Sequence, residues 1–93
     1  MKRTPQNIFY HELIGLEAII EAYPDPTIKG TRGVIVWETR RSLEIKVGAR
    51  VVRIFKEASV LRVNVPGYGW IRIKGELLTG TPPDRAKRML RGR

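Results

Sequence analysis

The eighteen lysine and arginine side chains of this 93-residue sequence are the residues most suited to a binding chemistry. They gather at a predicted turn, on the outward side of the later predicted strands, and in the C-terminal segment. Cations on one face neutralise phosphates and release counterions, and arginine can also fork two phosphate oxygens. The outward set is Lys46, Arg50, Arg53, Lys56, Arg62, Arg72 and Lys74. The predicted nucleic-acid contacts are Arg40, Arg41, Lys56, Arg72, Lys74, Arg85, Lys87 and Arg88.

The charge is unevenly distributed along the chain. Residues 1–28 carry a net charge of −2 and residues 29–93 a net charge of +11, which together give +9 and a pI of about 10.7. Such a balance favours a polyanionic partner, which can be RNA, DNA or an acidic membrane surface. The asymmetry favours a binding surface, although a merely solvated helix face or tail stays an alternative for residues 85–93.

Aromatic side chains add a second kind of binding chemistry. Trp37, Tyr68 and Trp70 can stack on unpaired bases. For Trp37 we favour packing in the core or at the end of the fold. Trp70 is predicted on the same side as Arg72 and Lys74, so stacking and packing are evenly balanced there.

Catalytic residue patterns are weak. His11 is the single histidine, there is no cysteine, and the nine carboxylates are spread singly, although distant ones can still meet in the fold. The stretch Gly30–Gly33 lacks the Gly-Lys-Ser/Thr of a phosphate-binding loop. We predict no catalytic residue and no metal site, and we argue against an enzyme that acts alone.

The elements that position these residues are mostly strands. Alternating apolar residues predict strands over 16–22, 34–37, 43–47, 50–55, 59–65 and 69–74. Thr4-Pro5 predicts a short helix to about Leu13, ending at Gly15, and Thr81-Pro82 predicts a helix start in which Thr81 caps the first turn. Short strands with tight turns favour a small antiparallel barrel. We therefore predict one domain, with an N-terminal helical segment (1–15), a barrel (16–78) and a basic C-terminal helix or tail (81–93).

Targeting signals are not evident. The start MKRTPQN has no apolar run after its basic residues, and no stretch reaches the roughly 18 apolar residues of a membrane helix. We expect a cytoplasmic protein.

Several short segments, in order, resemble a known family. Residues 7–16 (NIFYHELIGL) resemble the opening signature of the ribonuclease P protein component 1 family, the archaeal relatives of a eukaryotic ribonuclease P/MRP subunit. Residues 30–39 (GTRGVIVWET) resemble its Gly-x-x-Gly-x-Val-x-x-Glu-Thr stretch, and residues 43–45 (LEI) the strand after it. Residues 54–56 resemble an Ile-Pro-Lys motif, with Phe55 in place of Pro. Residues 75–80 and 82–85 resemble the closing signature, with Thr81 where the family often has Arg.

The resemblance implies a mainly β fold, a six-stranded antiparallel Sm-like barrel with short terminal helices. It implies a holoenzyme that matures the 5′ end of precursor tRNA, with magnesium-dependent chemistry in the ribonuclease P RNA and no cofactor in this chain. It also implies a protein partner, the zinc-binding ribonuclease P component 4. We expect the acidic, apolar N-terminal part to hold that partner through Ile8, Phe9, Tyr10, Leu13 and Ile19.

Other functions stay open at this point. A ribosomal or translation-factor barrel also fits the glycine-bounded turn at residues 30–33. A nuclease in its own right and a self-assembling Sm-type ring are further alternatives, although we expect a monomer alone and a heterodimer with its partner.

Overall fold

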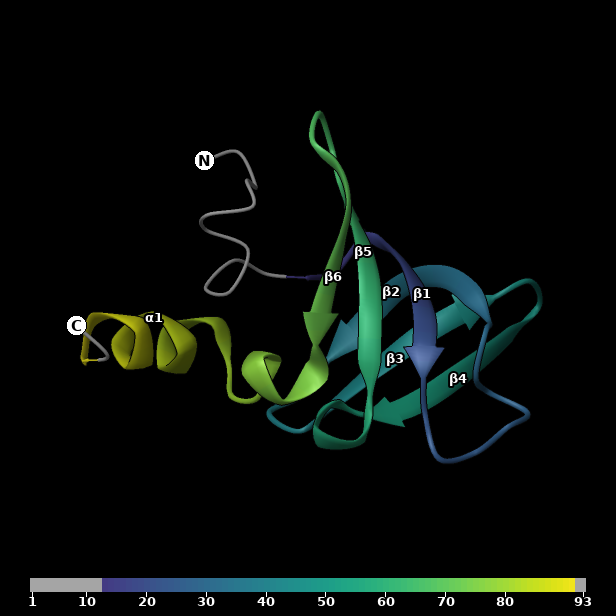
Figure 1. Cartoon of the computed structure of the whole chain (residues 1–93), viewed down its shortest axis with the longest axis horizontal. Helices are drawn as coiled ribbons and strands as arrows, with labels where there is room; N and C mark the ends of the chain where they lie inside the picture. The colour runs from purple at the N-terminus through teal and green to yellow at the C-terminus, as the bar shows by residue number, and fades with distance from the viewer. Residues whose placement is uncertain (1–12, 92–93) are drawn as a thin grey trace.

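The protein is mainly β, with six antiparallel strands and a C-terminal helix (Figure 1). The structure, a computed structural model, describes residues 13–91, and the side chains up to residue 86. The strands are β1 (Glu17–Ala22), β2 (Arg32–Glu38), β3 (Ser42–Val47), β4 (Arg50–Phe55), β5 (Val60–Val65) and β6 (Gly69–Lys74). Two 3-10 helices, η2 (Lys56–Ala58) and η3 (Gly75–Leu78), precede α1 (Pro82–Arg91). The predicted fold class is confirmed, whereas the helix expected over residues 4–13 falls almost wholly outside the described residues.

The strands form one sheet in the order β4-β3-β2-β1-β5-β6. The sheet curls so strongly that β6 and β5 lie in front of β3 in Figure 1. No ladder joins the edge strands β4 and β6 within residues 13–91. Instead η2 and η3 meet between them, where the Gly75 amide donates to the Ser59 carbonyl at 2.8 Å. The curled sheet is therefore closed at this corner by two helical turns.

Alternation of apolar residues builds the core. Leu16, Ala18 and Ile20 point inward from the first strand region, as the sequence predicts, and Leu43, Ile45, Leu61 and Val63 meet them from β3 and β5. Successive side chains of a strand point to opposite faces, so each strand gives one apolar row to the interior. The buried apolar residues are Leu13, Leu16, Ala18, Ile20, Ile35, Leu43, Ile45, Val52, Ile54, Leu61, Val63, Val65, Ile73 and Leu78.

A register shift in β2 overturns the prediction for Trp37. The β2–β3 ladder shifts between Ile35 and Trp37, which pairs with Glu44. A bulge inserts one extra residue and breaks the alternation, so Val36 and Trp37 both face outward. The Trp37 side chain is 55% exposed, and the expected packing in the core or at the barrel end is wrong.

The turns follow the glycine positions. Gly48 has φ +61 in the two-residue connection between β3 and β4, as expected for a tight hairpin. Gly33 serves close packing instead, because a Cβ there would overlap the Lys46 carbonyl group on β3. Among the described residues, no helix is long and apolar enough to cross a membrane.

The first turn of α1 has the predicted cap. The Asp84 amide donates to Thr81 Oγ1 at 3.4 Å, and the Thr81 amide donates to Asp84 Oδ2 at 3.3 Å. This reciprocal pattern satisfies two N–H groups at the start of the helix. In Figure 1, α1 projects away from the sheet, opposite the tip of the β3–β4 hairpin.

Candidate nucleic-acid interface

A buried ion cluster joins the C-terminal segment to the sheet. Glu38, at the end of β2, accepts hydrogen bonds on Oε2 from Lys56 Nζ at 2.8 Å and from Arg85 Nη1 at 2.7 Å. The Lys56 and Arg85 side chains are fully buried, and the Glu38 side chain is 4% exposed. The Glu38 carboxylate therefore forms ion pairs with two cations inside the protein.

Backbone carbonyl groups complete the solvation of these cations. Lys56 Nζ also donates to the Thr39 carbonyl at 2.7 Å and to the Gly80 carbonyl at 3.2 Å. Arg85 Nη1 donates to the carbonyls of Leu78, at 3.0 Å, and Gly80, at 2.7 Å. Buried charges are tolerated only when they are paired and hydrogen-bonded. Glu38 Oε1, by contrast, is buried without a hydrogen-bond partner.

The cluster corrects two predicted nucleic-acid contacts. Lys56 and Arg85 were predicted to face solvent, and both predictions are wrong because each side chain is fully buried. Lys56 directly follows β4 and continues its alternation, on the same inward side as the buried Val52 and Ile54, so the outward placement was inconsistent with the strand pattern. Arg85 lies on the side of α1 that faces Glu38. Glu38 was not predicted as a site residue. The sequence did contain a signal, because Glu38, Lys56 and Arg85 each lie in a different one of the segments that resemble the family.

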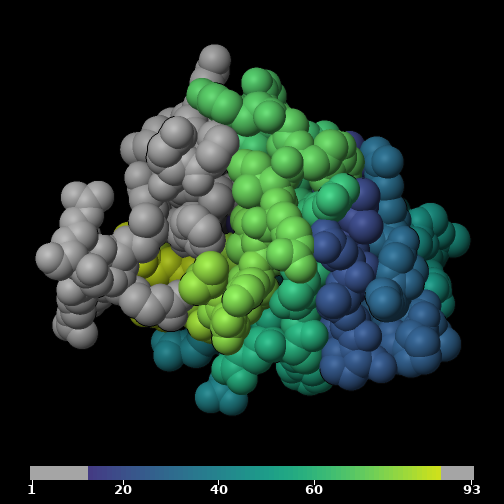
Figure 2. All heavy atoms as spheres, in the orientation of Figure 1, coloured from purple at the N-terminus to yellow at the C-terminus, as the bar shows by residue number. Residues whose placement is uncertain are grey.

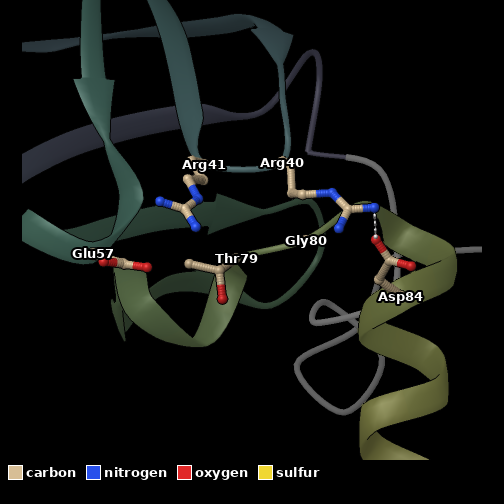
Figure 3. Close-up of a pocket in the computed structure, with 6 residues that line it drawn as sticks. All are labelled: Arg40, Arg41, Glu57, Thr79, Gly80 and Asp84. Carbon is tan, nitrogen blue, oxygen red and sulfur yellow. Dashed lines mark ion pairs between the residues drawn. The ribbon is translucent and has the colours of Figure 1, made fainter.

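Arg40 and Arg41 border a shallow hollow next to this cluster (Figure 3). Its volume is about 250 Å³, and its lining residues are Arg40, Arg41, Glu57, Thr79, Gly80 and Asp84. An Arg40 guanidinium nitrogen lies 3.2 Å from Asp84 Oδ2, and 72% of the Arg40 side chain is exposed. Both predicted arginines are thus at the surface, but two carboxylates share the hollow with them.

Exposed arginines on β2, β5 and β6 are paired with two glutamates of β1. Arg32 lies 2.9 Å from Glu17, and Glu21 binds both Arg62, at 2.9 Å, and Arg72, at 2.7 Å. The hydrogen bond from Arg32 lowers the pKa of Glu17, and the hydrogen bond from Arg72 is the main cause of the lowered pKa of Glu21. Figure 2 shows these strands side by side, β6 and β5 in green and β1 and β2 in purple and blue. This half of the outer surface is largely neutralised.

Two aromatic residues are exposed on β6 and the turn before it. Trp70 is 40% exposed and Tyr68 57% exposed. The Arg32 guanidinium lies 5.0 Å from the centre of the Trp70 ring and covers one of its faces. Trp70 is therefore at the surface, on the same side as Arg72 and Lys74, as the alternation predicted.

The remaining predicted residues have different positions. Leu13, expected to bind the protein partner, is fully buried in the chain's own core, so that prediction is wrong. Ile19 is half-buried on the outward side of β1, between Glu17 and Glu21. Ile8, Phe9 and Tyr10 lie outside the described residues, and the side chains of Lys87 and Arg88 lie outside the described side chains. Within the described part, no three His, Cys, Asp or Glu side chains gather as a metal site.

Known proteins resemble this chain over nearly its whole length. The family model of ribonuclease P/MRP subunit p29 matches residues 6–88. A ribonuclease P protein component 1 of Hyperthermus butylicus is 42% identical over 96% of this chain and 81% of the relative. One from Desulfurococcus amylolyticus is 45% identical over 98% of this chain and 100% of the relative.

A solved structure agrees with the sequence comparison. The structure of Mth11, described as a homologue of the human RNase P protein Rpp29, is 33% identical and superposes with a TM-score of 0.58. The match covers 81% of this chain and 97% of that chain. Sequence and fold thus agree, and the chain belongs to the ribonuclease P/MRP subunit p29 family.

Proposed function

We propose that this chain is a protein subunit of ribonuclease P and supports maturation of the 5′ end of precursor tRNA by binding the ribonuclease P RNA. Family membership over residues 6–88 is the observation that carries the proposal. The net charge of +9 on 93 residues is the physical property that suits an RNA partner.

The proposed RNA contacts are the predicted cations that are not buried. Arg40 and Arg41 stand at the hollow beside α1, and Lys74 is exposed at the end of β6. Arg72 is exposed but shares Glu21 with Arg62, so its net contribution to phosphate binding is smaller. Lys87 and Arg88, predicted as contacts from the sequence, belong to the same proposal. Trp70 and Tyr68 offer exposed rings for unpaired bases.

The proposal leaves bond cleavage to the RNA, with magnesium bound there and no cofactor in this chain. It includes precursor tRNA as the substrate of the complex, and the zinc-binding component 4 as the protein partner. That partner would bind at the N-terminal segment, through Ile8, Phe9, Tyr10 and the outward side chain of Ile19. The cytoplasmic location expected from the sequence belongs to the same proposal.

Affinity capture of the tagged chain from a related archaeon, followed by sequencing of the bound RNA, tests the proposal. We expect enrichment of the ribonuclease P RNA over ribosomal RNA. An Arg40→Gln/Arg41→Gln variant, which removes two exposed charges, should capture less of it. Enrichment of ribosomal subunits instead would support the ribosomal alternative and contradict the proposal.

A further inference from the structure

A second hollow adjoins the one in Figure 3, and Arg41 and Glu57 line both. Its volume is about 270 Å³, and its lining residues are Arg41, Phe55, Glu57 and Ala58. We call it the Phe55 hollow. It differs from the first hollow in chemistry, because it combines an aromatic ring with one cation and one carboxylate.

The Phe55 ring is the apolar surface of this hollow. The side chain is 54% exposed at the end of β4, although phenylalanine is usually buried. The Arg53 guanidinium lies 5.7 Å from the ring centre and covers one of its faces. Arg53 does not line the Phe55 hollow, so the hollow borders the ring on another side. An exposed ring of this kind is a surface on which a nucleobase can stack.

The backbone around the ring is fixed by hydrogen bonds. The Phe55 amide donates to the Tyr23 hydroxyl at 3.1 Å, and the Lys56 amide donates to the Arg41 carbonyl at 2.8 Å. The side chain of Lys56 is in turn anchored in the buried cluster with Glu38. The residues that carry the ring and the cation are therefore held in place before a ligand binds, which lowers the entropy lost on binding.

The two charges of the hollow are both available to a ligand. Arg41 and Glu57 are exposed, and neither has an oppositely charged side chain within 4.0 Å among the described residues. A carboxylate repels a phosphate but accepts hydrogen bonds from N–H groups. The occupant that suits a ring, a carboxylate and a cation together is a planar base with N–H donors that is linked to a phosphate.

We propose that the Phe55 hollow binds one unpaired guanine nucleotide of the RNA. The base stacks on the Phe55 ring, its N1–H and N2–H groups donate to the Glu57 carboxylate, and Arg41 contacts a neighbouring phosphate. Guanine is the base with two adjacent donors on its Watson–Crick edge, whereas the single N–H of uracil lies between two carbonyl oxygens that the carboxylate repels.

The inference rests on the proposed function in one respect, namely that the partner is RNA. It goes beyond that function by naming the base and the side chains that select it. Phe55 stands at the Pro position of the Ile-Pro-Lys motif, so the stacking ring is a property of this chain and not of the motif.

Short single-stranded RNAs test the choice of base. Oligouridines with a single guanine, inosine or uridine at the centre are titrated with the full-length chain at low ionic strength, and binding is followed by fluorescence anisotropy. A carboxylate that accepts two N–H groups from the base should favour guanine over uridine by about fivefold or more. Inosine, which lacks the 2-amino group, should bind with an intermediate affinity.

A charge-removing variant tests the role of Glu57. Glu57→Gln should lose most of the preference for guanine and bind the uridine RNA at least as tightly as the parent, because one negative charge is removed. Glu76→Gln is the control, since Glu76 is exposed but does not line the Phe55 hollow. It should keep the preference of the parent.

A second pair of variants tests stacking. Phe55→Leu keeps an apolar side chain but removes the ring, and it should weaken the binding of all three RNAs by about fivefold or more, whereas Phe55→Tyr should bind like the parent. The control is Trp37→Leu, which removes a ring of 55% exposure outside the hollow and should have little effect. Changes at such exposed positions should leave the unfolding temperature within a few degrees of the parent.

Chemical probing extends the test to the natural type of partner. Kethoxal reacts with N1 and N2 of unpaired guanines, the two atoms that would donate to Glu57. On a transcribed archaeal ribonuclease P RNA we expect at least one guanine that the parent chain and Glu76→Gln protect and that Glu57→Gln leaves reactive.

Equal affinity of the parent for the guanine and uridine RNAs would overturn the site, as would a preference retained in Glu57→Gln or equal effects of Phe55→Leu and Trp37→Leu. If Phe55→Leu loses a protein partner while its RNA affinity is unchanged, the hollow is a protein interface and the proposal is wrong. In each of these cases the parent still binds the ribonuclease P RNA, so the proposed function stands. Failure of the parent to bind that RNA would contradict both.

Discussion

Glu38 Oε2 lies 2.7 Å from Arg85 Nη1, across 47 positions of the sequence. The bond links the end of β2 to the first turns of α1, and Lys56 binds the same oxygen from η2. The backbone supports the link, since the Gly80 amide donates to the Arg40 carbonyl at 2.7 Å. The buried cluster therefore fixes how α1 leaves the sheet, and with it the position of the exposed arginines around the hollow.

Removing the carboxylate of this cluster should strongly destabilise the protein. In Glu38→Gln the two buried cations lose their counter-charge, and we expect the free energy of unfolding to fall by about 3–5 kcal/mol. The exposed Glu76→Gln is the control, with an expected change within about 0.5 kcal/mol. Urea denaturation followed by circular dichroism measures both, and equal midpoints would show that the cluster contributes nothing to stability.

We expect Arg85 to be a structural residue and Arg40 to be an RNA-binding residue. Arg85→Gln breaks a buried pair and should cost about 3 kcal/mol, whereas Arg40→Gln breaks an exposed pair worth at most about 1 kcal/mol. Under conditions where both variants are folded, Arg40→Gln should flatten the salt dependence of RNA binding and Arg85→Gln should not. The reverse result would restore Arg85 as an RNA contact.

Glu21 should make the stability depend on pH on the acid side. Hydrogen bonds from Arg72 and Arg62 lower its pKa below 4.5 in the folded protein. Between the lowered folded pKa and 4.5 the unfolded chain binds more protons, so stability rises with pH there. This contribution is fully present above pH 4.5 and is lost as the pH falls through the folded pKa. Urea midpoints between pH 3 and 6 should therefore fall less steeply in Glu21→Gln than in the parent, and parallel curves would contradict the assignment.

The same substitution should strengthen RNA binding. Glu21→Gln releases Arg62 and Arg72 from their shared carboxylate and removes one negative charge from the outer surface. We expect a larger salt slope and a higher affinity for structured RNA at low ionic strength. Filter binding compares Glu21→Gln with Glu76→Gln, which removes an unpaired carboxylate. The comparison separates the effect of releasing the arginines from the effect of the changed net charge. Equal gains in both variants would mean that net charge alone is responsible.

A glycine at the corner of the sheet should not tolerate a side chain. A Cβ at Gly75 would overlap the Lys56 carbonyl oxygen and Ser59 Oγ, where η2 and η3 meet. Gly75→Ala should lower the unfolding free energy by about 1–3 kcal/mol, the cost of an overpacked site. Ser59→Ala in the same chain should recover little, because the backbone oxygen remains, and full recovery would locate the clash at the hydroxyl alone.

Much of the fold follows from local pattern. The strands over 50–55 and 69–74 and the capped start of α1 match the sequence because their signals are local: alternation, turn glycines and a Thr-Pro cap. Trp37 differs from the prediction because the bulge in β2 depends on how β2 pairs with β3. The alternation of residue types within one strand does not show that pairing. Leu13 differs from the prediction because its burial depends on segments far away in the chain. Lys56 differs because the alternation of Val52 and Ile54, which continues to residue 56, was not applied to a charged residue.

The candidate site was harder to predict than the fold. A basic residue near a phosphate and a basic residue in a buried ion pair look alike in a sequence, and only the position of the carboxylate distinguishes them. Lys56 and Arg85 point inward and bind the buried Glu38. Glu17 and Glu21 form ion pairs with surface arginines, each of which the net charge counts as a full positive charge. Arg40, Arg41, Arg72 and Lys74 were placed at the surface, as the sequence predicted.

Reconstitution tests the central claim most directly. The archaeal ribonuclease P RNA is assembled with the other protein subunits, with or without this chain, and cleavage of a precursor tRNA is followed at low magnesium concentration. We predict that the mature 5′ end forms slowly without the chain, that adding it raises the rate, and that the chain without RNA cleaves nothing. Equal rates with and without the chain, or processing by the protein alone, would contradict the account.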